Sequence, residues 1–244
     1  EGGADLIIVY NSGMFRMAGR GSSCGRFAYS DANGLIFDMS NEILSSVKHT
    51  PVIAGIFGSD PYRNMERLLN QVCERGFSGI QNFPTMGNLS GIPRFYTNLC
   101  ETGYGYDKEI EMVRLANKLD LLTTPYCFNE NQAMRMVDTG TDIIVAHMGL
   151  TTKGMIGAAL SNNLDDCVEK ISKIARAAKS VNPNVLVISH GGAVSEPEDA
   201  QYIYDRVPET CGFYGASSAE RIPTENALID TVKAFKAIRI GGTL

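Results

Sequence analysis

Short runs of apolar, often β-branched residues alternate along this chain with longer amphipathic segments, and this alternation limits its fold more than any other feature. Successive apolar positions predict strands that are covered on both faces, which is typical of a parallel sheet packed between helices. Seven runs have the composition and length of such strands: residues 6–10, 52–57, 79–83, 121–126, 142–147, 185–190 and 212–215.

The segments between the strands predict helices, and several begin with N-terminal signals such as Asp107, Pro197 and Thr224. An open doubly wound sheet and a (β/α)8 TIM barrel both fit this α/β pattern. We favour the TIM barrel, because every strand ends in a turn containing Gly, Ser, Asn or His, whereas an open sheet concentrates such residues at one switch point. The expected helices cover residues 33–47, 63–74, 107–119, 130–137, 164–180, 198–207 and 224–237.

Length and composition predict a single domain over residues 1–244. The 244 residues are 44% hydrophobic and 20% charged, enough to bury a core without disulfides. The opening Glu1-Gly2-Gly3-Ala4-Asp5 has the composition of a helix end that leads into a strand. We therefore expect the first βα unit of the barrel to precede residue 1, which would make this domain N-terminally incomplete.

Several function classes lack support in the sequence. The net charge of −5 argues against a nucleic-acid partner, and no apolar run approaches the ~18 residues of a membrane span. The six cysteines form no C-x-x-C motif and have no ligand-spaced histidine, so we expect reduced thiols in a cytoplasmic protein. No lysine lies within a strand, and there is no nucleophile elbow or P-loop, which argues against Schiff-base, serine-hydrolase and NTPase chemistry.

The carboxyl ends of the strands carry the candidate catalytic residues, because a TIM barrel forms its active site there. His147 and His190 each end a strand, and a neutral imidazole can transfer a proton near pH 7. The alternative is that each ring only satisfies a loop carbonyl. Tyr10 and Asn82, also at strand ends, are expected to orient substrate and stabilise negative charge on oxygen.

The loops after the last two strands predict an anion site. Glycines and hydroxyls there let backbone N–H groups surround a phosphate or carboxylate, although Gly-Gly also forms ordinary turns. The long loop 11–33 contains Arg16, Arg20 and Arg26, which suggests an anion clamp or a subunit contact, the alternative being a solvated loop. The candidate substrate-binding residues are Asn11, Ser12, Arg16, Arg20, Tyr126, Gly191, Gly192, Gly215, Ser217, Ser218 and Glu220.

Metal binding and assembly are less strongly indicated. Carboxylates at strand ends are scarce, with Asp60 the best placed and Glu101 and Glu220 further into loops. This pattern weakens a Mg²⁺ site without excluding one, and we predict no metal ligands and identify no cofactor. The loop 11–33 and the insertion 84–106 are rich in Met, Phe and Tyr, so we expect a homo-oligomer.

Six segments carry a resemblance to a known family: ADLIIVYNSG (4–13), FRMAGRGS (15–22), GIQNFPT (79–85), VAHMGLTT (145–152), HGG (190–192) and GASSAER (215–221). Together they resemble the phosphoenolpyruvate hydrolase-like TIM-barrel family. The resemblance implies a barrel related to phosphoenolpyruvate/pyruvate-binding barrels that is often fused to, or encoded with, a second domain. Barrels of that wider superfamily hold Mg²⁺ through clustered Asp and Glu, a pattern from which this sequence departs.

We therefore expect an enzyme, a hydrolase or lyase, that cleaves a C–O or C–C bond in a small anionic enol or keto-acid metabolite. His147 and His190 would act as general acid and base, and Arg16 and Arg20 would hold the anion with the two glycine- and serine-containing loops. The alternative is a non-catalytic ligand-sensing or assembly domain that serves a partner domain or protein.

Overall fold

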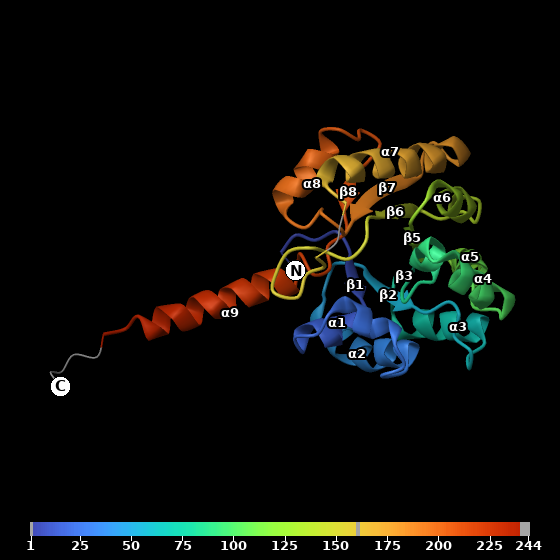
Figure 1. Ribbon diagram of the computed structural model, residues 1–244. Coiled ribbons are helices and arrows are strands. Elements are labelled where there is room, and N and C mark those ends of the chain that lie inside the picture. The colour runs from blue at the N-terminus through green and yellow to red at the C-terminus, as the bar shows by residue number, and fades with distance from the viewer. Residues whose placement is uncertain (1, 160–161, 240–244) are drawn as a thin grey trace.

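A computed structural model describes residues 2–159 and 162–239, and Figure 1 shows its parallel strands surrounded by helices. The strands are β1 (Ile7–Val9), β2 (Val52–Ile56), β3 (Gly79–Asn82), β4 (Leu122–Thr123), β5 (Tyr126–Cys127), β6 (Ile143–His147), β7 (Leu186–His190) and β8 (Gly212–Phe213). The α-helices are α1 (Asn11–Met17), α2 (Ala32–Ser46), α3 (Met65–Arg75), α4 (Pro93–Glu101), α5 (Tyr106–Lys118), α6 (Glu130–Val137), α7 (Leu164–Val181), α8 (Pro197–Tyr204) and α9 (Arg221–Lys236). Two 3-10 helices, η1 (Ser22–Arg26) and η2 (Gly87–Gly91), lie in the loops.

The strands form two parallel sheets of neighbours in chain order, β1-β2-β3-β4 and β5-β6-β7-β8. The predicted strand 121–126 is split into β4 and β5, which pair with β3 and β6 respectively. Pro125 lies between them and has no N–H to donate, although its carbonyl accepts from Val145 N at 3.0 Å. The predicted parallel α/β architecture is confirmed, and β4 and β5 occupy one position between β3 and β6.

The first and last strands do not pair within residues 2–159 and 162–239. Between them lies a cavity of about 590 Å³ whose apolar walls include Leu6, Ile8, Ile188 and Phe213. The expected βα unit ahead of residue 1 stays a prediction, because Glu1 and anything before it lie outside the described residues.

All seven predicted helices are present, with ends shifted by a few residues. Helix α9 begins at Arg221 rather than Thr224, since Pro223 is tolerated in a first helical turn where no N–H donor is needed. The loops 11–33 and 84–106 were expected to be irregular, but they contain α1, η1, η2 and α4. These elements are short and start without a side-chain cap, so they carry less sequence signal than the longer helices.

Side chains alternate along each strand between two cores. One core lies between the sheet and the helices and includes Ile144 and Val187. The other fills the inside of the curved sheet and includes Tyr126, Val145 and Ile188. In the part of the chain that the structure describes, no helix is long and apolar enough to cross a membrane.

Candidate active site

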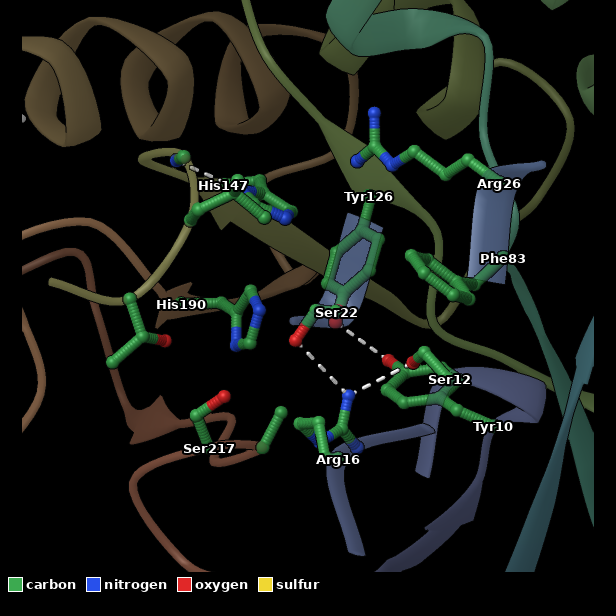
Figure 2. A pocket seen from close by; sticks show the side chains of 14 residues that line it. Tyr10, Ser12, Arg16, Ser22, Arg26, Phe83, Tyr126, His147, His190 and Ser217 are labelled. Atoms are coloured by element: carbon green, nitrogen blue, oxygen red, sulfur yellow. Dashed lines mark hydrogen bonds between the residues drawn. The ribbon is translucent and has the colours of Figure 1, made fainter. Parts of the chain in front are cut away.

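The inward-facing residues at the carboxyl ends of the strands line a small cavity (Figure 2). Ile143, Val145 and His147 alternate inward along β6, and Ile188 and His190 do the same along β7. The parallel register pairs His147 directly with His190. Sheet geometry therefore brings together two residues that are 43 positions apart in the sequence.

Aromatic rings enclose both imidazoles. The two histidine rings lie 4.6 Å apart between centroids, in an edge-to-face arrangement. Phe128 stacks on His147 at 4.6 Å, and Tyr126 stacks on His190 at 4.9 Å. Figure 2 shows Tyr126 between the two histidines on one side and Phe83 on the other. These contacts fix the position of each ring.

Backbone groups assign different tautomers to the two histidines. Gly149 N–H donates to Nδ1 of His147 at 2.9 Å, so a neutral His147 carries its proton on Nε2. Nδ1 of His190 lies 2.5 Å from the carbonyl oxygen of Tyr214, so it carries the proton and donates it to that oxygen. Nε2 of His190 is then a free acceptor, whereas Nε2–H of His147 is a donor.

Burial keeps both rings neutral. Desolvation lowers the pKa of His190 to about 4. Desolvation also lowers the pKa of His147 well below its ordinary value, and the nearby His190 and Arg26 lower it further. At pH 7 the site thus contains one imidazole donor and one imidazole acceptor rather than an imidazolium.

Two tyrosines complete the inner wall. The hydroxyl oxygens of Tyr10 and Tyr126 lie 2.6 Å apart and share a hydrogen bond. Burial raises the pKa of both phenols well above the ordinary value, so both keep their protons. The phenols therefore supply neutral hydrogen-bonding groups rather than a second base.

Arg16 is a structural link between two loops. Its guanidinium forms an ion pair with Glu220, which precedes α9, and donates to Ser12 Oγ at 2.8 Å and Ser22 Oγ at 3.4 Å. Arg16 lines the cavity, but its charge is already matched by a carboxylate. Glu220 is likewise engaged, so the pair holds the first and last loops of the site together.

Arg26 belongs to the suggested anion clamp of loop 11–33, although the candidate substrate-binding residues included only Arg16 and Arg20 of its three arginines. It lines the cavity, its Nε is buried with no partner, and no ion pair within the described residues includes it. Its guanidinium carbon lies 6.0 Å from the Phe83 ring centroid, and desolvation lowers its pKa. The sequence placed three arginines in this loop, but only folding shows which one is left unpaired beside the histidines.

The structure gathers many of the predicted residues in one cavity and places others elsewhere. Tyr10, Ser12, Arg16, Tyr126, His147, His190 and Ser217 line the cavity. Arg20 is exposed and lies outside its walls. Gly215 and Ser218 line the separate cavity between β1 and β8. The roles assigned to all of these residues stay predictions.

Four of the predicted residues lie outside the cavity lining and position the segments that form it: Asn11, Asn82, Gly191 and Gly192. Asn11 donates to the carbonyl of Gly25 at 2.8 Å, which positions the arginine-bearing loop. Gly191 and Gly192 have positive φ values of 74° and 63°, and added Cβ atoms would lie 2.3 Å and 2.7 Å from the carbonyl oxygens of Gly149 and Met148. This close approach brings the loops after β6 and β7 together.

Glu109 is a further residue that sequence analysis missed. Its buried carboxylate accepts from Asn82 Nδ2 at 2.5 Å, Thr85 Oγ1 at 2.7 Å and Met86 N at 2.5 Å. Asn82 Oδ1 in turn accepts from Tyr126 N at 2.6 Å. Burial raises the pKa of Glu109 to about 7. Nothing in its position within α5 distinguishes it from a surface glutamate.

The donor set is a poor fit for Mg²⁺. Imidazole, phenol, guanidinium and hydroxyl groups dominate the cavity, whereas Mg²⁺ prefers carboxylate oxygens. Within the residues that the structure describes, no three His, Cys, Asp or Glu side chains gather in a way that could hold a metal ion.

Comparison with known proteins agrees with this architecture. The sequence profile described as phosphoenolpyruvate hydrolase-like matches residues 1–238. The chain belongs to this family. The phosphoenolpyruvate hydrolase-like chain is also 49% identical over 237 residues to the tomato (Solanum lycopersicum) ToMV susceptible protein tm-1(GCR26) and 48% identical to the tomato ToMV resistance protein Tm-1(GCR237). Both matches cover 97% of this chain and 31% of the relative, so the chain spans about a third of their length.

Other relatives are more distant. The phosphoenolpyruvate hydrolase-like chain is 31% identical over its whole length to a putative transcriptional regulatory protein of Sinorhizobium fredii, and it covers 39% of that protein. Among solved structures, it resembles a putative lyase/mutase of Burkholderia cenocepacia with a TM-score of 0.59 at 14% identity, over 99% of this chain and 78% of that one. A putative phosphonomutase of the same organism gives a TM-score of 0.50 at 13% identity, over 95% and 92%. These likenesses identify the fold as a TIM barrel.

Proposed function

We propose that this chain is an enzyme that cleaves a C–C or C–O bond in a small anionic enol or keto-acid substrate by acid-base catalysis. The observation that carries the proposal is the pair of neutral histidines with opposite tautomers beside an unpaired arginine. A general acid and a general base must present a donor and an acceptor to the same substrate, and this arrangement supplies both.

Arg26 is the proposed anchor for the substrate carboxylate. A guanidinium can donate two parallel hydrogen bonds to a carboxylate, and burial strengthens such bonds. The hydroxyls of Ser12, Ser22 and Ser217 line the same cavity and add donors. Arg16, already bound to Glu220, keeps the loop that carries Arg26 in place.

In a C–C cleavage, Nε2 of His190 takes the proton of a substrate hydroxyl. The O–H electron pair forms a new carbonyl, the C–C bond breaks, and its electrons pass to the oxygen of the neighbouring keto group. Nε2–H of His147 stabilises the resulting enolate by a hydrogen bond, and the proton that His190 accepted converts the enolate to the enol. The neutral phenols of Tyr10 and Tyr126 add hydrogen-bond donors near that oxygen.

In a C–O cleavage, the same two nitrogens act on water and on the leaving group. His190 Nε2 takes a proton from water as its oxygen attacks carbon. The C–O bond breaks with its electron pair on the leaving oxygen, which accepts a hydrogen bond from His147 Nε2–H and takes up the proton that His190 accepted from water. Both routes use the same base and the same hydrogen-bond donor, so the product distinguishes them.

The test is a substrate screen followed by matched variants. The 244-residue chain is incubated with keto acids, hydroxy keto acids and enol phosphates, and products are followed by NMR. For a substrate that turns over, we expect His147→Asn and His190→Asn each to lower kcat by about 10²- to 10⁴-fold. Turnover at wild-type rates in both variants would contradict the assignment.

Two arginine variants test Arg26 as the anchor of the substrate carboxylate. Arg26→Gln should lower kcat/KM by about 10- to 100-fold, because it removes a charged hydrogen-bond donor from the cavity. Arg20→Gln removes the same charge from an exposed position of the same loop and should leave kcat/KM unchanged. Equal losses in the two variants would point to a general charge effect instead.

A ligand-sensing or assembly domain is the second candidate function. It is favoured by the names of the longer relatives, which refer to ToMV resistance and to transcriptional regulation rather than to catalysis. The same screen separates the two candidates. A keto acid that raises the Tm of the chain without any product, with and without Mg²⁺, would favour sensing.

A further inference from the structure

A second cavity adjoins the one that contains the histidines. It has a volume of about 200 Å³, against about 30 Å³ for the histidine cavity. The two cavities share four lining residues, namely Ser22, Leu150, Thr151 and Ser217. A ligand that is longer than the histidine cavity therefore extends past these residues into the second cavity.

Unpartnered hydroxyl groups line the second cavity. Ser217 is 4% exposed, and its hydroxyl has no hydrogen-bond partner within residues 2–159 and 162–239. Figure 2 shows this hydroxyl directed into the space between His190 and Arg16. The hydroxyls of Ser23 and Thr151 also lack a partner in the described part of the chain. Because a hydroxyl both donates and accepts, these three groups are suited to a polar ligand.

The charge in the walls of the second cavity is already matched. Among the described residues, Arg221 is the one charged side chain that lines it. The Arg221 guanidinium donates to Glu225 Oε1 at 2.8 Å and to the carbonyl of Lys153 at 2.7 Å. A phosphate is best bound by an unpaired cation, whereas hydroxyls beside a balanced ion pair suit a neutral, hydroxylated chain.

The two ends of the site differ, and this difference gives a bound substrate a direction. Figure 2 places Arg26 and Ser217 on opposite sides of the space that the histidines border. Burial lowers the pKa of both imidazoles, and the charge of Arg26 adds to this effect at His147, while that of Arg16 adds to it at His190. The carboxylate and keto oxygen thus lie toward Arg26 and His147, and the hydroxyl that His190 deprotonates lies toward Ser217.

We propose that the substrate is a 4-hydroxy-2-keto acid whose chain continues beyond C4 as a neutral, hydroxylated tail, and that the hydroxyls of Ser23, Thr151 and Ser217 bind this tail in the second cavity. The inference rests on the proposed function, because Arg26 and the two histidines orient the substrate.

The cleavage step assigns one product to each cavity. Nε2 of His190 takes the proton of the C4 hydroxyl, the O–H electron pair forms the carbonyl of an aldehyde, and the bond between C3 and C4 breaks. The electrons of that bond pass to the keto oxygen and give the enolate of pyruvate, to which His190 returns the proton. The aldehyde keeps the hydroxylated tail in the second cavity, and pyruvate stays beside Arg26.

Calorimetric titration of two keto acids measures whether the tail is bound. The titrations use the 244-residue chain with His190→Asn, which lacks the proposed base, so that the probes stay intact. One probe is 2-oxo-4-hydroxybutanoate, which ends at C4, and the other is 3-deoxy-2-oxohexonate, which has two further hydroxylated carbons. We expect the hexonate to bind at least about 10-fold more tightly, because its two extra hydroxyls each gain a hydrogen bond.

Serine variants on the same background test which hydroxyls bind the tail. Ser23 lines the second cavity and not the histidine cavity, so Ser23→Ala should weaken hexonate binding by about 3- to 10-fold and leave the Kd of the butanoate unchanged. Ser217→Ala should weaken hexonate binding by a similar factor. Ser218→Ala is the control, because Ser218 lines the cavity between β1 and β8, and it should change neither Kd. Near-UV circular dichroism checks that each variant is folded.

The inference and the proposed function can fail separately. A hexonate that binds no more tightly than the butanoate, or whose Kd neither Ser23→Ala nor Ser217→Ala changes, would overturn the inference. Tighter binding of the hexonate 6-phosphate than of the hexonate would overturn the neutral tail. If the wild-type chain binds the hexonate through these serines without releasing pyruvate, the second cavity stands as a binding site and the proposed enzyme fails. Release of pyruvate from the butanoate alone would support the enzyme and contradict the inference.

Discussion

At the scale of single residues, chemistry in this chain depends on which atom of each histidine carries the proton. The N–H of Gly149 and the carbonyl of Tyr214 decide this, and both belong to the backbone beyond the strand ends. Histidine gives the sequence a titratable ring, but its tautomer and its pKa come from the surroundings. His147 and His190 were therefore identifiable as candidates, while their separate roles as donor and acceptor were not.

The low pKa of His190 predicts an unusual pH profile. Its ring is neutral down to a pH of about 4, so kcat/KM should stay level from pH 7 toward pH 5 and decline only as the pKa of about 4 is approached. The measurement is a pH-rate profile on the substrate found by the screen, together with NMR titration of the His190 ring. An acid limb centred at the ordinary histidine pKa near 6.5 would contradict the assigned environment.

The buried carboxyl of Glu109 predicts that the free energy of unfolding falls as the pH rises. Its pKa is about 7 in the folded chain against 4.5 ordinarily, so the folded state binds a proton that the unfolded state releases over this range. Stability from this group is present below pH 4.5 and is lost as the pH rises through 7. Relative to wild type, Glu109→Gln should therefore gain up to about 3 kcal/mol in unfolding free energy between pH 4.5 and pH 8.

Urea denaturation at several pH values measures this difference. Glu111→Gln is the matched control, since Glu111 is half-exposed on the same helix and forms an ion pair with Arg114. The Glu111 variant should follow the wild-type pH dependence. A constant difference between wild type and the Glu109 variant across this pH range would show that Glu109 keeps its ordinary pKa.

At the scale of elements, the site depends on how closely the loops after β6 and β7 approach each other. Gly191 at a φ of 74° and Gly192 at 63° accept the main-chain contacts that bring these loops together. The sequence HGG indicated a turn and a candidate anion cradle. It did not show that the glycines face the backbone of the neighbouring loop rather than the cavity.

Replacing Gly191 with Ala should disrupt this junction. The new Cβ would lie 2.3 Å from the carbonyl oxygen of Gly149 in a left-handed backbone conformation, so we expect a loss of about 2–4 kcal/mol in unfolding free energy. Gly21→Ala is the control, because no atom lies within 4 Å of its added Cβ and its φ is −69°. Chemical denaturation measures the unfolding free energy of both variants. Equal values for Gly191→Ala and Gly21→Ala would contradict the role of Gly191.

Strands and long helices were predictable because their hydrophobic periods are set by burial on one or both faces. Helices α2, α3, α6 and α7 also begin at side chains that cap them, namely Asp31, Asn64, Asn129 and Asn163. Helices α1 and α4 lack a capping side chain and show an incomplete hydrophobic period, so the sequence did not predict them. The interruption between β4 and β5 was also missed, since one proline does not change the apolar period around it.

At the scale of the whole molecule, the described residues hold no cluster of three metal-ligating side chains. Two carboxylates near the cavity are already engaged, Glu220 by Arg16 and Glu109 by Asn82. We therefore predict that turnover survives dialysis against EDTA and does not increase when Mg²⁺ is restored. Activity assays before and after dialysis test this. A loss that Mg²⁺ reverses would show that the ligands lie outside the described residues or come from the substrate.

The sequence by itself determined the alternation of strands and helices, and hence the parallel α/β fold with His147, His190, Tyr10 and Tyr126 at one end of the sheet. These features follow from local periodicity, which depends only on near neighbours in the chain. The tertiary structure alone decided that Arg26 rather than Arg20 enters the cavity, that Glu220 neutralises Arg16 and that Glu109 lies behind Asn82. Pairings of charge and burial between distant residues exist only after the fold brings the strands and their loops together, so no local pattern encodes them.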